Sequence, residues 1–213
     1  MNLANRLRSW FLRFAGYVVP FVQSLPAVGG WVGLMTLPFA TYLFLFFANL
    51  PESLVDVLSS FFAPSPLFIL ERIFIVMGIF LLIYSIAYLR IKRREGLVTS
   101  GPYQLSRHPQ YLGMILSTLG LTSWSVWILN NTRGVGFLNS TQTILAWFIE
   151  LSAYVLLALV EEMFLSNKHR TTFNDYKSQT PFLIPFLRTK RKYLDVLASI
   201  LILSLILLIL INL

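Results

Sequence analysis

Residues that could do chemistry in this 213-residue chain concentrate in two polar stretches. The first runs from Gly96 to Gly113 and holds Arg107, His108 and Pro109 in succession. Pro109 suits the first position of a new helix, where a backbone N–H is not needed. Arg107 and His108 would then lie at a helix start, which favours a bound anionic group. Gly113 would let a ligand or another helix approach closely. The alternative is a basic loop before an ordinary helix.

The second stretch is the acid pair Glu161-Glu162, followed by a tail with Tyr and Pro residues that ends at Phe186. Carboxylates near the C-terminus of a helix oppose the helix dipole. Either Arg107 and its neighbours or a cationic ligand should therefore compensate this pair. The alternative is that both carboxylates are simply solvated at a helix end.

A third candidate is Glu150, which interrupts an otherwise apolar run. It precedes Glu161 by eleven residues, almost three helical turns, so both share one helix face with Tyr154. An acid inside a membrane helix is a functional candidate when it faces the bundle interior. A neutral, hydrogen-bonded structural role is equally open. We expect Glu150 to face the interior, with its partner among Ser117, Thr118, Tyr84 and Ser85.

The composition limits the class of protein. Hydrophobic residues make up 56% of the chain and charged residues only 12%, with a mean hydropathy of +0.71. A soluble domain carries roughly a quarter charged residues, so we predict an all-α polytopic membrane protein. With no Cys and only two His, a disulfide or a metal site is not expected. The net charge of +8 indicates anionic lipid headgroups, and not nucleic acid, as the partner.

Five apolar runs have about the 20 residues that a membrane-spanning helix needs. They are Trp31–Leu50, Ile73–Leu89, Tyr111–Leu129, Thr141–Val160 and Leu194–Leu213. Before them, residues 1–30 carry apolar residues at helical spacing with arginines between, which predicts a basic amphipathic helix lying in the membrane interface. We expect four segments: this helix (1–30), two spans (31–89), a core (90–186) and a final span (187–213).

The distribution of basic residues predicts the orientation. Fifteen of the 17 Lys and Arg residues fall before the first run or after the second and fourth runs. The positive-inside rule places these segments, and with them the N-terminus, in the cytosol. Only Arg72 and Arg133 remain on the other side. Both polar stretches would therefore face the cytosol.

Together, the two stretches resemble the isoprenylcysteine carboxyl methyltransferase and phospholipid methyltransferase superfamily. The first half of the resemblance is Arg107-His108-Pro109-x-Tyr111-x-Gly113, preceded by Leu97-Val98-Thr99-x-Gly101-x-Tyr103. The second half is Glu161-Glu162-x-x-Leu165, followed by Tyr176 and Pro181…Pro185. The resemblance covers about residues 90–186. His169-Arg170 and Phe173 depart from the pattern, which bears on the substrate more than on the cofactor.

The resemblance implies a membrane methyltransferase with S-adenosylmethionine bound in a cytosol-facing pocket. The chain has no Rossmann glycine fingerprint after a strand, in agreement with this. The implied catalytic residues are Arg107 and Glu162. The implied cofactor contacts are Tyr103, His108, Tyr111, Gly113, Glu161, Glu162 and Tyr176.

The acceptor would be a lipid or a prenylated group from the bilayer, and its path would be lined by Glu150 and Tyr154. Carboxyl O-methylation leads over N-methylation of an amino-lipid, on the resemblance alone. A non-enzymatic lipid-binding or transport protein on the same scaffold is another alternative. A reductase of the sterol type would need more spans and a larger dinucleotide pocket.

Overall fold

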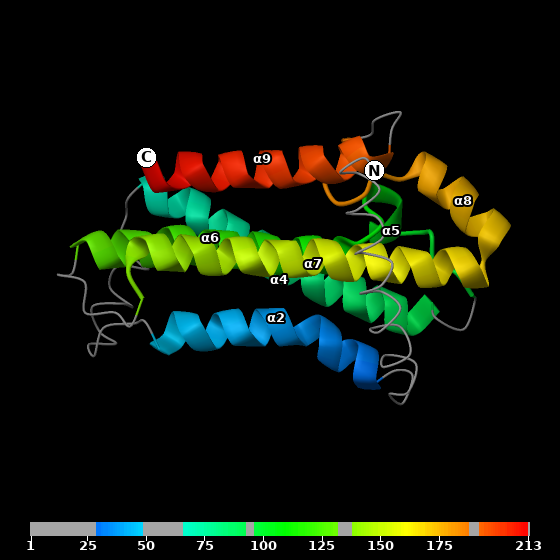
Figure 1. Ribbon diagram of the computed structural model, residues 1–213, viewed down its shortest axis with the longest axis horizontal. Helices are drawn as coiled ribbons and strands as arrows, with labels where there is room; N and C mark the ends of the chain where they lie inside the picture. Colours follow the sequence, from blue (N-terminus) through cyan, green and yellow to red (C-terminus); the bar gives the residue numbers. More distant parts are fainter. Residues whose placement is uncertain (1–28, 49–65, 93–95, 132–137, 188–191, 213) are drawn as a thin grey trace, which may run out of the picture.

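The computed structural model describes residues 29–48, 66–92, 96–131, 138–187 and 192–212 (Figure 1). Over these ranges the chain is all-helical and has no strand, as predicted. The helices are α2 (Gly29–Ala48), α4 (Pro66–Lys92), α5 (Pro102–Leu105), α6 (Pro109–Asn131), α7 (Ser140–Lys168), α8 (Arg170–Gln179) and α9 (Lys192–Asn212). The amphipathic helix predicted for residues 1–30 lies almost entirely outside the described residues.

Four of the five predicted spans form helices that are long and apolar enough to cross a membrane. These segments are Ile69–Lys92, Pro109–Asn131, Ser140–Lys168 and Tyr193–Asn212. The run predicted at Trp31–Leu50 forms α2, but the apolar segment found there, Gly33–Ala48, is shorter than the other four. The integral membrane class is therefore supported, and the count of five spans stays a prediction.

Helix α6 lies at the centre of the bundle and contacts α2, α4, α7 and α9. Nearly all of its residues are buried, whereas α4 and α9 turn many large apolar side chains outward, as lipid-facing helices do. The contact between α4 and α6 is very close because glycines lie in it. A Cβ atom added to Gly78 would lie 2.6 Å from the backbone oxygen of Gly113. Small residues of this kind allow membrane helices to pack backbone to backbone.

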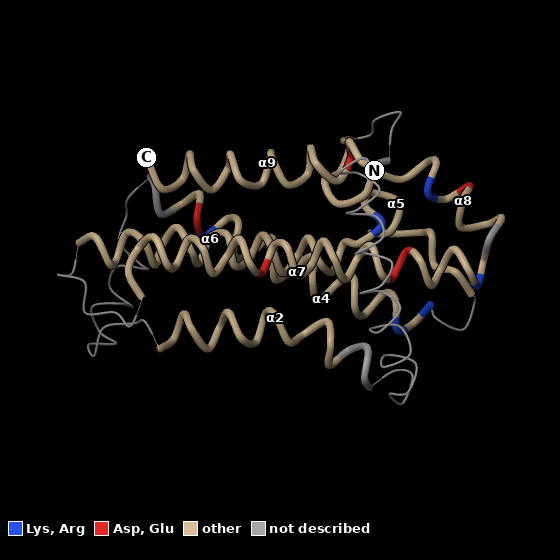
Figure 2. Tube along the Cα trace, viewed as in Figure 1, with Lys and Arg blue, Asp and Glu red and all other residues tan. Residues whose placement is uncertain are grey.

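Basic residues gather at one end of the bundle. Among the described residues, Figure 2 shows most Lys and Arg at the end of the bundle where α8 lies. Arg90 and Lys92 lie in the last turn of α4, and Lys168 lies in the last turn of α7. At the opposite end, the carboxylate of Glu71 accepts a hydrogen bond of 2.6 Å from the hydroxyl of Ser123. This asymmetry agrees with the charge distribution that predicts a cytosolic face at the α8 end.

Helix α2 contains Pro38, which has no N–H to donate to the preceding turn. Next to it, the Tyr154 hydroxyl from α7 donates to the carbonyl of Met35 (3.1 Å) and accepts from the N–H of Phe39 (3.0 Å). An uninterrupted helix would join that carbonyl and that N–H to each other. Figure 1 shows α2 bending along its length, as expected where a proline and an inserted side chain disturb a helix.

Candidate functional site

The two polar stretches meet at the α8 end of the bundle, although 47 residues separate them in the sequence. The start of α6 positions His108, and the last turns of α7 position Glu161 and Glu162. The His108 ring lies between the two acids: Nδ1 is 3.3 Å from Oε2 of Glu161, and Nε2 is 3.6 Å from Oε1 of Glu162. Of the two predicted ways to compensate the acid pair, Arg107 and its neighbours or a cationic ligand, the structure shows the first.

Glu162 is the centre of a buried ion cluster. Its carboxylate pairs with Arg107, whose Nε lies 2.7 Å from Oε1, and with the ammonium group of Lys177 from α8. The side chains of Arg107 and Glu162 are only 3% and 4% exposed. A carboxylate this deeply buried needs several positive or hydrogen-bonding partners. The cluster thereby ties α7 to α8.

Arg107 also fastens the tail that follows α8. Its Nη1 donates to the backbone carbonyls of Lys177 and Thr180, each at 3.0 Å, and its own backbone N–H donates to Pro181, also at 3.0 Å. The guanidinium carbon lies 5.6 Å from the centre of the Phe182 ring, within the range of a cation–π contact. Arg107 thus holds the tail against the loop before α6.

Beside this cluster lies a cavity of about 280 Å³. Its walls come from the loop before α6, the end of α7 and α8, and they include Leu97, Val98, Tyr103, Arg107, His108, Glu161, Leu165, Phe173 and Tyr176. Among the acids of the described residues, only Glu161 lines this cavity, and its side chain is 22% exposed. The cavity therefore combines one carboxylate and several aromatic faces, which favour a positively charged group, with the cationic side chains of Arg107 and Lys168, which favour an anionic one.

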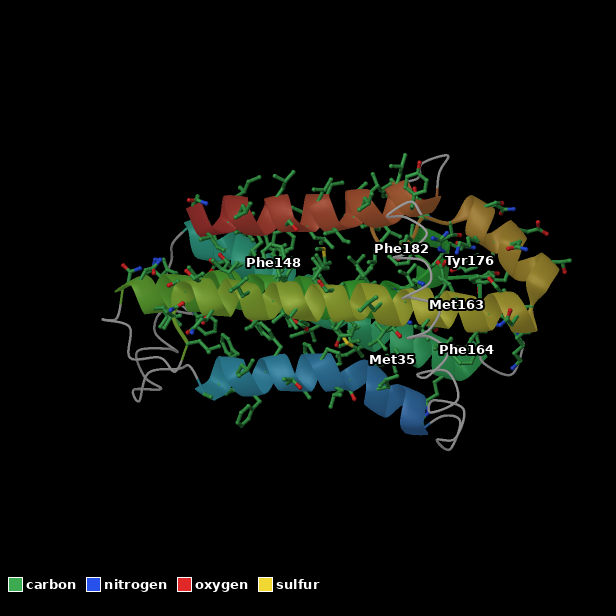
Figure 3. All side chains as sticks on the ribbon, viewed as in Figure 1. Met35, Phe148, Met163, Phe164, Tyr176 and Phe182 are labelled. Atoms are coloured by element: carbon green, nitrogen blue, oxygen red, sulfur yellow. The ribbon has the colours of Figure 1, made fainter. Side chains whose placement is uncertain are left out.

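The aromatic wall is held by hydrogen bonds to the backbone. The hydroxyl of Tyr176 donates to the carbonyl of Tyr103 at 2.6 Å, and the hydroxyl of Tyr103 donates to the carbonyl of Ser85 at 3.4 Å. Burial raises the pKa of both phenols above their ordinary value of 10. Both therefore stay neutral donors at physiological pH. Figure 3 shows Tyr176 at the α8 end of the bundle, near Phe182 of the tail.

His108 carries a pKa above its ordinary value of 6.5. Burial alone would lower the pKa, but the hydrogen-bonding and charge interactions with Glu161 and Glu162 together outweigh burial and raise it. On its other side the ring stacks on Tyr111, with 5.5 Å between ring centres. His108 is thus a pH-sensitive link between the acid pair and the interior.

Replacing His108 by glutamine should remove a stabilising charge that depends on pH. Since the folded protein raises the pKa of His108, the protonated ring contributes fully below the unfolded pKa, and this contribution is lost as pH rises through the folded pKa. The stability difference between wild type and His108→Gln should be largest near about pH 6 and should shrink at alkaline pH. Thermal unfolding across pH measures it. A difference that does not change with pH would mean that the ring is uncharged.

Not all predicted site residues reach the cavity. Tyr103, Arg107, His108, Glu161 and Tyr176 line it, whereas Glu162 lies behind Arg107. The other four predicted residues, Tyr111, Gly113, Glu150 and Tyr154, are not part of its lining. Of these, the two tyrosines connect to the site by stacking. The Tyr111 ring lies between His108 and Tyr154, with 5.4 Å between the centres of the two tyrosine rings.

Gly113 packs against α4. A Cβ atom there would lie 2.7 Å from the backbone nitrogen of Leu82 and 2.8 Å from the backbone oxygen of Gly78. Of the two approaches that the sequence left open for this glycine, ligand or helix, the structure shows the helix.

Glu150 faces the bundle interior, as predicted, and is 4% exposed. Thr118, one of the predicted partners, lies close enough to interact with it, but its hydroxyl donates to the carbonyls of Met114 and Ile115. Tyr84, another predicted partner, is 44% exposed. Within the described ranges, neither carboxyl oxygen of Glu150 accepts a hydrogen bond. The acid is thus buried without a full set of partners.

Sequence reasoning missed Lys177, Phe173 and Phe182 as parts of the site. Lys177 completes the ion cluster, Phe173 lines the cavity, and Phe182 lies under the Arg107 guanidinium. For Lys177 a signal existed: it is the residue next to Tyr176, in a short polar helix that follows the acid pair. Phe173 stands out in the sequence only as a departure from the family pattern, and Phe182 carries no comparable signal in a chain with 18 phenylalanines.

One comparison with known proteins gave a match. The family model described as phospholipid methyltransferase matches residues 66–172, half of the chain. The matched segment runs from the start of α4 into α8 and contains both Arg107-His108 and Glu161-Glu162. Searches among curated proteins and among solved structures gave no match. The chain belongs to the phospholipid methyltransferase family, within the superfamily of integral membrane methyltransferases that the two motifs resemble.

Proposed function

We propose that this chain transfers a methyl group from S-adenosylmethionine to a lipidic acceptor taken from the bilayer. The observation that carries the proposal is the cavity of Glu161, His108, Tyr103 and Tyr176, which both motif halves build at the basic end of the bundle. The proposed core is residues 90–186. By the charge distribution, we place the cavity and the N-terminus in the cytosol, with five spans.

The lining fits the proposed cofactor. When bound, S-adenosylmethionine supplies an electrophilic methyl group on a positively charged sulfur. The Glu161 carboxylate and the aromatic faces of Tyr103 and Tyr176 favour a cation. The N-terminus of α6, directly after His108, offers free backbone N–H groups to a carboxylate.

Arg107 and Glu162 have different roles in this proposal. Arg107 lines the cavity, so its guanidinium is the group that would bind an acceptor carboxylate. Glu162 lies behind it, paired with both Arg107 and Lys177. We therefore assign Glu162 as a positioning residue that orients Arg107. Methyl transfer depends on such orientation, because it is a direct displacement that needs no covalent intermediate on the protein.

For the acceptor, we propose carboxyl O-methylation first, on the position of Arg107. The second candidate is N-methylation of an amino-lipid, which Glu161 favours, because its carboxylate in the cavity could accept the proton that an amine loses. Incubation with a methyl-labelled donor distinguishes them. Label in a methyl ester is released by mild base, whereas label on nitrogen is retained.

Titration calorimetry on the purified protein tests the cofactor assignment. We expect saturable binding of S-adenosylmethionine and of its demethylated product. Absence of binding for both ligands, in a protein that still unfolds cooperatively, would overturn the proposal.

Replacing Glu161 by glutamine should weaken S-adenosylmethionine binding at least tenfold and affect the demethylated product much less. The reason is charge, since only the sulfonium is cationic. An ion pair at about 4 Å is worth up to about 4 kcal/mol near a protein surface, and solvent access to Glu161 reduces this toward the roughly 1.4 kcal/mol of a tenfold change. Asp175→Asn, which removes an exposed acid on α8, is the matched control. Equal losses of affinity for both ligands would show that Glu161 does not interact with the charge of the sulfonium.

A further inference from the structure

Tyr154 joins two helices in a way that the catalytic cavity does not require. Its hydroxyl accepts from Phe39 and donates to Met35 on α2, on either side of Pro38. The side chain is fully buried. One hydroxyl group thus takes the place of the backbone hydrogen bond between Met35 and Phe39, next to the bond that Pro38 cannot donate. Figure 3 shows Met35 on the side of α2 that faces α7.

The same tyrosine is connected to the cavity through a row of rings. Tyr154 packs on Tyr111 with 5.4 Å between ring centres, and Tyr111 stacks on His108 at 5.5 Å. His108 lines the cavity. Along α7, Tyr154 precedes Glu161 by seven residues, about 10 Å. The break in α2 is therefore separated from the cavity by two aromatic side chains.

On this basis we propose that Tyr154 is the latch of a lateral entrance between α2 and α7, through which the acceptor reaches the cavity from the bilayer. The inference rests on the proposed function, because it assumes an acceptor that is embedded in lipid. Pro38 is the hinge. When the Tyr154 hydroxyl releases Met35 and Phe39, the part of α2 before Pro38 moves away from α7. Figure 1 shows that this part of α2 lies toward the α8 end.

The contact between α4 and α6 offers no comparable opening. Between α4 and α6, added Cβ atoms at Gly78, Gly113 or Gly120 would all lie within 2.8 Å of backbone atoms of the facing helix. This contact leaves no room for a lipid chain. By contrast, α2 lies outside the segment that matches the family.

Glu150 lies one helical turn deeper than Tyr154 on α7 and interacts with it. Its carboxyl oxygens have no hydrogen bond within the described ranges. An opened latch would therefore expose an unsatisfied acid next to a free phenol. This pair favours acceptors whose polar end donates hydrogen bonds, such as the ammonium group of the second candidate acceptor, over a carboxylate.

The absence of cysteine from the chain allows a direct test. Ala158 is fully buried one turn from Tyr154, on the cavity side, so Ala158→Cys places a single thiol behind the latch. The probe is a vesicle of phosphatidylcholine that contains a phosphatidylethanolamine with a maleimide on its headgroup. We expect Tyr154→Phe to raise the rate of lipid attachment to the thiol at least fivefold. A membrane-impermeant maleimide in the water should gain less than twofold.

Tyr42→Phe is the matched control. It also removes one buried hydroxyl that ties α2 to the bundle, the one that lies 2.5 Å from the Thr122 hydroxyl, but on the other side of Pro38. The lipid attachment rate should change less than twofold in this variant. Equal increases of the lipid attachment rate in both tyrosine variants would overturn the proposed entrance. An increase of the attachment rate with the aqueous reagent alone would also overturn it.

Hydrogen exchange on the cysteine-free chain gives an answer even if Ala158→Cys does not fold. Peptides that cover Met35–Phe39 should exchange at least fivefold faster in Tyr154→Phe, and less than twofold faster in Tyr42→Phe. Unchanged exchange in Tyr154→Phe would overturn the latch. Neither experiment needs methyl transfer, so failure here is distinct from failure of the cofactor titration.

Discussion

Replacing Arg107 by alanine should lower turnover at least a hundredfold and destabilise the fold by about 3 kcal/mol, the lower end of the range for breaking a buried ion pair. The substitution leaves the Glu162 carboxylate with a reduced set of positive partners and frees the carbonyls of Lys177 and Thr180. The tail after α8 would lose its fastening. Thermal unfolding and transfer of labelled methyl to vesicle lipids measure the two effects.

Two further variants separate the causes of this loss. Arg107→Lys keeps the charge but cannot reach Glu162 and both carbonyls with one planar group, so we expect it to recover stability more than turnover. Arg90→Ala removes an exposed arginine at the same end of the bundle and should change neither stability nor turnover. Turnover close to that of the wild type in Arg107→Ala would remove Arg107 from the catalytic assignment.

Replacing Gly113 by alanine should destabilise the bundle by roughly 1–3 kcal/mol or more, the range for overpacking a tight core. The added methyl group would lie 2.7 Å and 2.8 Å from backbone atoms of Leu82 and Gly78. Backbone atoms cannot move aside as a flexible side chain can, so α4 and α6 must separate. Thermal unfolding of the purified protein measures this loss.

Gly33→Ala is the matched control, because a Cβ atom at Gly33 would have no neighbour within 4 Å. In the helix α2 it should be neutral or stabilise by up to about 1 kcal/mol. The resemblance to the family implies a cofactor contact at Gly113, and the packing argues for a structural role. Normal stability with lost cofactor binding in Gly113→Ala would favour the cofactor contact.

The membrane helices could be predicted from the sequence because lipid contact demands apolar side chains in long runs. The ends of these helices could not be predicted. The run Ile73–Leu89 lies within the longer α4, Pro66–Lys92, because a helix continues through the headgroup region, where apolarity is no longer required. The same limit applies to α7, which extends beyond the predicted run on both sides.

The site could be predicted in part. In a chain this apolar, a charged side chain has few possible partners. The pairing of Arg107 with the acid pair could therefore be foreseen. The sequence could not predict that Glu161 lines the cavity while Glu162 lies behind Arg107. Adjacent residues of a helix point about 100° apart, and only the packing of α7 against α8 decides which of them faces the cavity. The contact of Tyr154 with α2 likewise depends on tertiary structure alone.

Helix α8, which lines the cavity, and the tail after it are anchored at both ends along the chain. Residues 170–187 follow α7 directly and precede α9, which packs on α4 and α6. A segment anchored at one end can swing free into many conformations, but a short loop between two fixed points has far fewer. Less conformational entropy is then lost when the tail closes over a ligand, and a high effective concentration keeps it close to its binding surface. Exchange of ligands should therefore proceed by small displacements of Tyr176 and Phe173, with the tail never leaving the bundle.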